Sequence, residues 1–240
     1  MAYKRIDSLI SSSGVMSRSS IKTLIKKGLV SAGGMIIKSP SEKVDTLSEI
    51  SVDGKRIYTT ENICLMMNKP AGYVSTTDKT ENSIMNLIPE NLKRKGLFAV
   101  GRLDKDTEGL LLITDDGDLS HRITSPKKNL EKTYIAELSK DITEADIKLF
   151  QEGMILKDGF KTKPACLTRL APRLAEVRIR EGRYHQVKRM FACSGNSVLS
   201  LKRISIGGLT LDKELEPGEV RPLLKSEINK ICLLYTSRCV

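Results

Sequence analysis

The apolar positions of the first 58 residues follow two different periods. Residues 6–10 have apolar side chains at helical spacing, and a second helical pattern begins near Ser17 and stops at Gly28. Short apolar runs separated by glycine turns come next, as is typical of brief strands. These runs cover residues 29–31, 35–37, 50–52 and 56–58. The pattern predicts a small α+β unit that spans residues 1–58.

A polar break at residues 59–62 separates this unit from a longer stretch of strand-like segments. Strands are expected at residues 63–67, 97–100, 110–113, 131–138, 166–170, 175–180 and within 198–211. Helices are expected near residues 119–123, 144–150 and 187–191. The pattern therefore predicts a larger α+β domain over residues 62–231. Residues 232–240 carry no domain signal, and we set them aside as an atypical tail.

A cluster of charges interrupts the apolar runs between Val100 and Thr114, where the chain reads V-G-R-L-D-K-D-T-E-G-L-L-L-I-T. Because apolar runs flank the cluster and Gly101 and Gly109 punctuate it, the charges are predicted to lie on a loop held by strands. Such a loop can present a side chain to a substrate while its backbone stays fixed. Asp104 is the candidate catalytic residue. The alternative is a solvated turn whose surface ion pairs contribute little energy.

The chain has a strong excess of positive charge. Its 240 residues include 40 Lys and Arg against 29 Asp and Glu, which gives a net charge of +11 and a pI near 9.4. Such an excess favours a polyanionic partner, because binding neutralises phosphates and releases counterions. Charge alone does not separate RNA from DNA or from an acidic membrane.

The sequence gives little indication of a metal site, a disulfide bond or a membrane-spanning segment. The five cysteines lack C-x-x-C spacing, and two histidines are too few for a multi-histidine metal centre. The N-terminus lacks the uninterrupted apolar segment of a signal peptide, and no stretch approaches the length of a transmembrane helix. We therefore expect reduced cysteines, no metal site, no membrane partner and a cytoplasmic location.

Four motifs of the longer domain together resemble those of pseudouridine synthases. They are K-P-A-G at 69–72, G-R-L-D-K-D-T-E-G-L at 101–110, K-T-Y at 132–134 and E-G-R-Y-H-Q-V-K-R-M-F at 181–191. The resemblance implies isomerisation of uridine to pseudouridine in RNA, which requires no cofactor. It also implies a domain built on a mixed, mostly antiparallel sheet flanked by helices.

The resemblance assigns roles to individual residues. It makes Asp104 the catalytic carboxylate, acting either as a nucleophile or by stabilising positive charge on the ribose. Arg102 fills the space left by the flipped uridine, and Tyr134 stacks on its base. Arg183 pairs with Asp104, and Lys69 helps to hold the active site. His185 and Gln186 are expected to be structural.

The first 58 residues resemble an S4 RNA-binding domain. The strings R-I-D-x-L-I, S-R-S-x-I-K-x-L-I-K-K-G-L-V and V-D-G-K-R-I carry this resemblance. In that family a basic helical pair grips structured RNA. The RNA-binding residues implied here are Lys4, Arg5, Ser17, Arg18, Lys22, Lys26 and Lys27.

Three further strings indicate the RNA target. T-D-D-G-D-L-S-H-R-I-T-S-P-K, the third motif around Y-H-Q, and I-G-G-L-T-L-D resemble the RsuA family, whose substrate is uridine 516 of 16S ribosomal RNA. We therefore expect 16S rRNA, either free or within an assembling small subunit, as the partner. We infer no obligate protein partner. Large-subunit (23S) relatives more often have an Asn-Arg string in the third motif.

Two other classes of function remain as alternatives. Asp104, Asp106 and Glu108 resemble the paired carboxylates of a glycosidase, but that function leaves the basic excess unexplained. A non-catalytic S4-type ribosome assembly factor would bind RNA without needing Asp104, Tyr134 and Arg183, all of which are present.

Overall fold

The computed structural model describes residues 3–59, 62–78 and 80–231, so the predicted tail at 232–240 lies outside the described residues. Contacts divide the chain into two compact units. The first gathers the described residues up to Ile63 with two later segments, Ile88–Phe98 and Thr114–Asp116. The second contains Cys64–Leu87, Ala99–Ile113 and the described residues from Gly117 onward.

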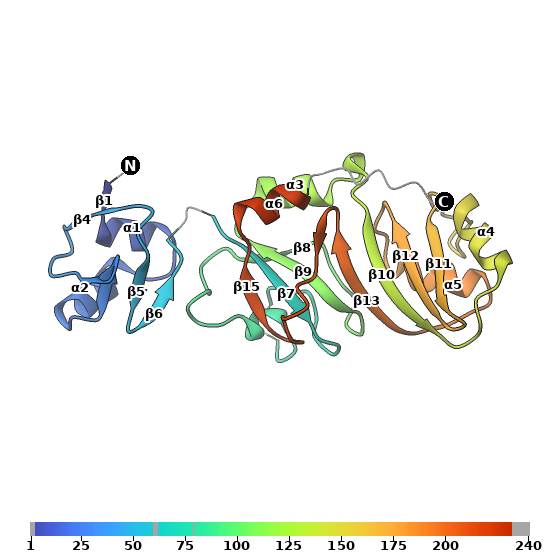
Figure 1. The fold of residues 1–240 in the computed structure, drawn as a ribbon, viewed down its shortest axis with the longest axis horizontal. Coiled ribbons are helices and arrows are strands. Elements are labelled where there is room, and N and C mark those ends of the chain that lie inside the picture. The colour runs from blue at the N-terminus through green and yellow to red at the C-terminus, as the bar shows by residue number, and fades with distance from the viewer. Residues whose placement is uncertain (1–2, 60–61, 79, 232–240) are drawn as a thin grey trace. The chain divides into compact units, whose positions relative to one another are not determined.

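The first unit combines two helices with short strands (Figure 1). Its elements are β1 (Tyr3–Arg5), α1 (Ile6–Ser12), α2 (Arg18–Lys26), β2 (Val30–Ala32), β3 (Met35–Ile36), β4 (Lys43–Asp45), β5 (Ile50–Val52) and β6 (Lys55–Ile57). The sheet order is β3-β2-β5-β6, and β1 pairs separately with β4. The apolar helical positions predicted to face inward, including Ile6, Ile10, Ile21 and Ile25, form its core with the strands. The β1–β4 pair was not predicted, because β1 is exposed throughout and β4 has a single buried apolar residue, Val44, so neither strand shows apolar alternation.

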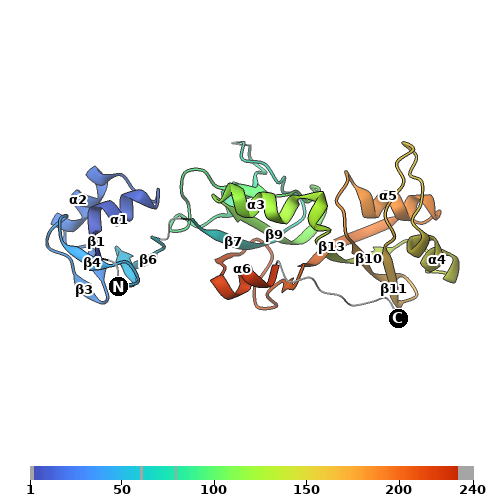
Figure 2. The same ribbon diagram turned by 90° about the horizontal axis from the view of Figure 1, so that it is seen from above.

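The second unit is organised by one long sheet (Figures 1 and 2). Its strands are β7 (Cys64–Lys69), β8 (Phe98–Val100, at the unit boundary), β9 (Glu108–Thr114), β10 (Lys132–Leu138), β11 (Cys166–Ala171), β12 (Leu174–Ile179), β13 (Val198–Ile206), β14 (Leu209–Thr210) and β15 (Val220–Pro222). Its helices are α3 (Gly117–Thr124), α4 (Glu144–Glu152), α5 (Gln186–Cys193) and α6 (Lys225–Ile231), with 3₁₀ turns at Ile84–Leu87 and Pro126–Lys128.

The sheet runs in the order β11-β12-β10-β13-β9-β7-β15, with β14 and β8 pairing to β13 and β9. The neighbours β11–β12, β12–β10, β10–β13 and β7–β15 pair antiparallel, whereas β13 and β9 pair parallel. The predicted mixed, mostly antiparallel sheet is therefore confirmed. The parallel β13–β9 pair brings the beginning of β9, and with it the end of the charged loop, next to β13, the middle strand of this order.

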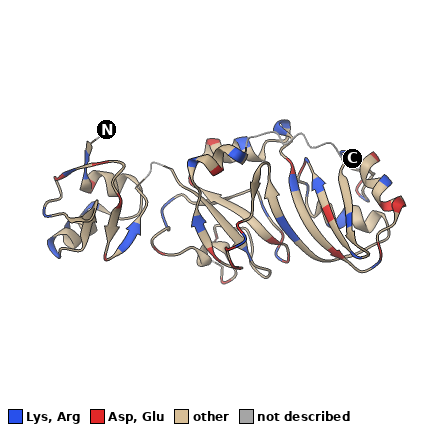
Figure 3. Cartoon of the chain, in the orientation of Figure 1, with Lys and Arg blue, Asp and Glu red and all other residues tan. Residues whose placement is uncertain are grey.

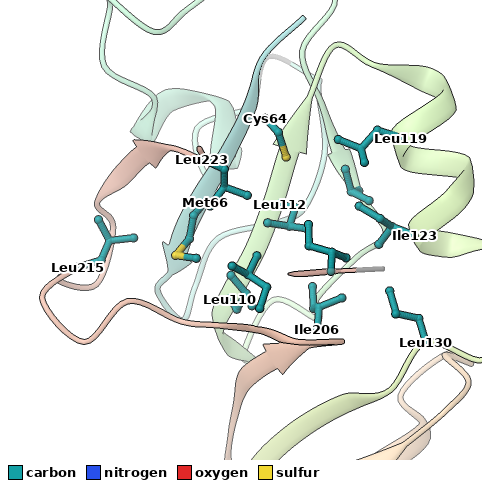
Figure 4. Packing of buried hydrophobic residues seen from close by; sticks show 13 residues of the cluster. Cys64, Met66, Leu110, Leu112, Leu119, Ile123, Leu130, Ile206, Leu215 and Leu223 are labelled. Atoms are coloured by element: carbon teal, nitrogen blue, oxygen red, sulfur yellow. The ribbon is translucent and has the colours of Figure 1, made fainter. Parts of the chain in front are cut away.

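The core beside this loop packs helices onto the central strands (Figure 4). Leu110 and Leu112 of β9 alternate toward Leu119 and Ile123 of α3, and Ile206 of β13 joins them. Because Leu111 and Ile113 are also fully buried, β9 is covered on both faces. This double coverage explains why its sequence is a continuous apolar run. The charged loop therefore begins and ends on backbone that is firmly packed.

Within the described part of the chain, no helix combines the length and apolar character needed to span a membrane.

Candidate active site

The charged loop is anchored by the K-P-A-G-Y-V-S segment that follows β7. The loop ends in a tight turn, in which the Thr107 amide donates to the Asp104 carbonyl at 3.1 Å. The Ser75 hydroxyl donates to the Leu103 carbonyl at 3.0 Å and accepts from the Leu103 amide at 3.1 Å. The Gly72 amide donates to the Lys105 carbonyl at 2.8 Å. The backbone is therefore fixed on both sides of Asp104.

Lys69 completes this anchoring from beneath the loop. Its side chain is fully buried, and its ammonium donates to three carbonyl oxygens, those of Pro70 at 3.0 Å, Lys105 at 3.2 Å and Thr107 at 2.8 Å. An ammonium group has three N–H donors, so all of them are used. Burial lowers the pKa of Lys69 to about 8, although nearby carboxylates, Asp106 first among them, oppose the shift. Lys69 thus holds the loop as a cation at neutral pH.

Gly109 fixes the other end of the loop against β13. It pairs with Arg203 in the parallel ladder and has φ +96°, which few residues other than glycine adopt. A β-carbon at this position would lie 2.3 Å from the Arg203 carbonyl oxygen. The Arg203 side chain is buried, and its Nε donates to the Leu110 carbonyl at 2.8 Å. Close backbone approach therefore requires the glycine of the E-G-L string.

Asp104 lies opposite the beginning of α5. Its side chain is 26% exposed, which leaves the carboxylate accessible to a substrate. Among the described residues, the basic side chains within ion-pair distance are His185, whose Nε2 lies 3.4 Å from Oδ1, and Lys188, whose Nζ lies 4.0 Å from Oδ2. Lys188 therefore places a positive charge beside Asp104, and His185 places an imidazole there.

Asp106 shares one of these cations but has a different environment. Its side chain is 73% exposed, and the Lys188 ammonium bonds to it at 2.5 Å. This hydrogen bond is the main reason that the pKa of Asp106 lies below its usual value. The two carboxylates of the loop therefore differ, because Asp106 is tied up by a short contact on the surface while Asp104 faces the site.

The expected pairing of Arg183 with Asp104 is not what the structure has. The Arg183 guanidinium lies over the Phe160 ring, with its central carbon 4.4 Å from the ring centroid. The physical reason is helix geometry, because Arg183 precedes α5, whereas His185 caps it and Lys188 lies three residues further on the same side. Sequence reasoning missed Lys188. The signal was present, since Val187, Met190 and Phe191 mark the core face of α5 and leave Lys188 off it.

Tyr134 lies in the middle of the sheet, on a row that reaches the charged loop. It pairs with Arg203 of β13, and Arg203 pairs in turn with Gly109 of β9. Two strand spacings of about 4.8 Å separate Tyr134 from the end of the loop. The ring is largely buried together with Ala136 and Leu138, which confirms that these residues share one face of β10.

Arg102 is exposed two residues before Asp104, after Gly101 with φ +70°. Within the described ranges, no three His, Cys, Asp or Glu side chains gather as a group that could hold a metal ion.

In the first unit, the residues expected to bind RNA are all exposed. Arg18, Lys22 and Lys26 recur every fourth residue along α2, away from the buried Ile21 and Ile25. Two of the expected residues also have structural partners. The Ser17 hydroxyl caps α2 by accepting from the Ser20 amide at 3.2 Å, and Arg5 makes two hydrogen bonds to the buried Asp7, at 3.1 and 2.9 Å.

Comparison with known proteins identifies the family. The family described as RNA pseudouridylate synthase matches residues 63–193, which include Lys69, the charged loop, Tyr134 and α5. An RNA pseudouridine synthase of Bacillus subtilis, itself uncharacterised, is 41% identical over 239 residues, covering 94% of this chain and 97% of that protein. The ribosomal small subunit pseudouridine synthase A of Escherichia coli K12 is 40% identical over 230 residues, covering 95% of this chain and 99% of that protein.

A solved structure supports the same assignment. A crystal structure of a pseudouridylate synthase matches with a TM-score of 0.67 and 41% sequence identity, covering 95% of this chain and 99% of that one. The match includes the sheet that carries the anchored loop. Sequence motifs, sheet topology and these relatives agree, and the chain belongs to the pseudouridine synthase family as an enzyme of the RsuA type.

Proposed function

We propose that this enzyme converts uridine 516 of 16S ribosomal RNA to pseudouridine, with Asp104 as the catalytic carboxylate. The observation that carries the proposal is the fixed and accessible position of Asp104, between Ser75 and Lys69 anchors and beside two basic side chains. The 40% identity to the small-subunit enzyme of Escherichia coli supports the choice of RNA.

The reaction moves the C1′ bond of the ribose from N1 to C5 of the same uracil. The N1–C1′ bond breaks with its electron pair passing to the base, the uracil turns, and C5 supplies the pair for the new bond. The hydrogen of C5 then leaves as a proton and N1 takes up a proton, so the product is an isomer of the substrate and no oxidant or reductant is consumed. Asp104 acts on the nucleotide as a carboxylate, either attacking a carbon atom or balancing positive charge on the ribose.

The neighbours of Asp104 support this chemistry. Lys188 provides positive charge beside the carboxylate and His185 places an imidazole there, and the hydrogen-bonded loop removes the need to reorganise the backbone during reaction. Tyr134 stacks on the extruded uracil, as aromatic side chains commonly do with flipped bases. Arg102 occupies the gap that the uridine leaves in the RNA. Lys69 and Arg183 are assigned to positioning, Lys69 through the loop and Arg183 through its contact with Phe160.

Residues 1–58 are proposed to form an S4-like RNA-binding unit in a cytoplasmic enzyme. The exposed row Arg18, Lys22 and Lys26 on α2 supports this role, because cations at such spacing can neutralise successive phosphates. Arg5 and Ser17 contribute mainly by holding α1 and α2 in place, since both have partners within the unit. Lys4 and Lys27 are also exposed, and we assign them to the same role.

The substrate is tested by supplying 16S and 23S rRNA labelled with tritium at C5 of uridine. We expect release from 16S rRNA only, and chemical mapping should place the new pseudouridine at position 516. Release from 23S rRNA instead would assign the enzyme to the large subunit. Binding of either RNA without any release, in naked form and in assembling particles, would favour the assembly-factor alternative.

A further inference from the structure

Tyr184 presents an exposed aromatic face beside the proposed catalytic carboxylate. Its side chain is 75% exposed, yet its ring is stacked on His185, with centroids 3.8 Å apart and planes inclined by 16°. His185 in turn places Nε2 at 3.4 Å from Asp104. The outer face of Tyr184 is therefore the end of a short stack that begins at the reactive group.

The backbone around this stack is fixed by contacts on both sides. Gln186 accepts from the Arg183 amide at 3.0 Å, and the Arg189 guanidinium donates to the Tyr184 carbonyl at 3.4 Å. Arg189 is itself tied to Asp158 at 2.6 Å. His185 adopts φ +49°, a left-handed conformation that is uncommon for a residue with a side chain. Such conformations persist where surrounding contacts enforce them, often at functional sites.

The exposed ring suits a nucleobase better than it suits the protein core. Large exposed aromatic side chains on rigid backbone are the usual platforms for unpaired bases, because every base has a π face. A uridine that leaves its stack to reach Asp104 also leaves an adjacent base without a stacking partner. Tyr184, one ring away from the residue that touches Asp104, is placed to receive it.

We propose that Tyr184 is a stacking platform for the nucleobase next to the target uridine in the RNA strand, and that it contributes to substrate selection. This inference rests on the proposed function insofar as the substrate is RNA. It assigns to Tyr184 a role in binding the RNA around the target, while Asp104 carries out the chemistry.

Steady-state kinetics with the 16S substrate tests the role through three variants. Tyr184→Ala should raise KM roughly 5- to 150-fold, the loss expected for one base–aromatic stack, with kcat at saturation changed little. Tyr184→Phe should restore KM, because the ring and not the hydroxyl is needed. Leu199→Ala is the matched control, since Leu199 is also 65% exposed in the same unit and should leave KM unchanged. An unchanged KM in Tyr184→Ala, or a failure of Phe to rescue, would overturn the proposal.

A spectroscopic test separates this proposal from the proposed reaction. The chain contains no tryptophan, so Tyr184→Trp provides a single tryptophan at the platform, whose fluorescence can be excited apart from that of tyrosine. In an Asp104→Asn background, binding a 16S fragment should quench this fluorescence, and fragments made abasic at each neighbour of the target in turn should include one that does not quench. Leu199→Trp in the same background should show no such difference.

Equal quenching by the intact and both abasic fragments would contradict base stacking, as would binding without quenching. Because this readout requires no turnover, quenching that depends on the neighbouring base would support the platform even if tritium release failed. The failure of one proposal can therefore be distinguished from the failure of the other. Quenching caused by RNA contacts other than base stacking would not depend on the presence of one particular base.

Discussion

At the scale of single residues, the site depends on which basic group neighbours Asp104. Sequence alone favoured Arg183, but the first turn of α5 brings His185 and Lys188 to the carboxylate instead. The side chain of a residue before a helix points in a different direction from that of a residue in the first turn. A sequence motif gives the order of the residues but not these directions. Substituting Lys188 and Arg183 separately therefore tests which of the two contributes to catalysis.

Lys188→Met should reduce kcat by about 100-fold, because it removes a preorganised positive charge from beside the reacting group. Arg183→Met should have a much smaller effect on kcat, since its guanidinium contacts Phe160. Single-turnover kinetics of both variants at saturating RNA measures the difference. A larger loss of kcat in Arg183→Met would mean that Arg183 moves onto Asp104 when RNA binds.

Gly109 offers a second prediction at the residue scale. Gly109→Ala should lower the free energy of unfolding by about 3 kcal/mol or more, because the new β-carbon would collide with the Arg203 carbonyl at a positive φ. Denaturant unfolding measures this loss. Gly159→Ala is a useful control, because Gly159 also has a positive φ but has open space around its β-carbon position. Equal losses in both variants would show that the close approach to β13 is not important.

At the scale of elements, the loop and the segment after β7 act as one piece, joined through Lys69. Below pH 8 its ammonium supplies three N–H groups to three carbonyls, whereas the neutral amine has only two. One of the three carbonyls, two of which belong to the loop, therefore loses its donor as pH rises. Stability changes in the opposite sense, because between pH 8 and 10.5 the unfolded chain binds more protons at this lysine than the folded chain does.

We therefore expect kcat to fall above pH 8 while the contribution of Lys69 to the free energy of unfolding increases. Lys69→Met should abolish this alkaline fall and reduce kcat by about 100-fold at pH 7, since the loop is no longer held in register. Lys132 also has a pKa lowered to about 8 by burial, so Lys132→Met is the control and should keep the fall. Single-turnover rates from pH 6.5 to about 9.5 test this. An alkaline fall that survives in Lys69→Met would place the titrating group elsewhere.

Local patterns predicted most of the regular elements, because apolar periodicity reports burial directly. Leu110 to Ile113 indicated β9, and Tyr134, Ala136 and Leu138 indicated β10. Helix α6 was missed, since its short polar sequence gains support from contacts distant in the chain, such as the hydrogen bond from the Gly208 amide to the Lys230 carbonyl at 3.0 Å. The three carbonyl acceptors of Lys69 could not be predicted either, because backbone acceptors leave no trace in a sequence.

At the scale of the whole molecule, the excess of 11 positive charges is spread over both units. Figure 3 shows Lys and Arg on α2 and β6 of the first unit and, interspersed with Asp and Glu, on the strands of the second. A polyelectrolyte partner makes the contribution of such charges dependent on salt. Linking two RNA-binding units would also raise affinity without any additional contact.

Lys22→Ala combined with Lys26→Ala should weaken binding of 16S fragments and reduce the slope of log K against log salt by about 2, one for each lost phosphate contact. The rate at saturating RNA should stay unchanged, because neither lysine lies in the catalytic unit. Lys148→Ala is the comparison, since this lysine of α4 is exposed and pairs with Glu152. An unchanged slope in the double variant would remove α2 from the RNA surface.

The most direct test of the account compares Asp104→Asn with Asp106→Asn in the tritium-release assay on 16S rRNA. The two variants change neighbouring carboxylates of one loop by the same atoms, and both remove one negative charge near Lys188. We expect Asp104→Asn to abolish release while RNA binding persists, and Asp106→Asn to retain most of the release. Full activity in Asp104→Asn, with binding intact, would contradict the assignment of the catalytic carboxylate.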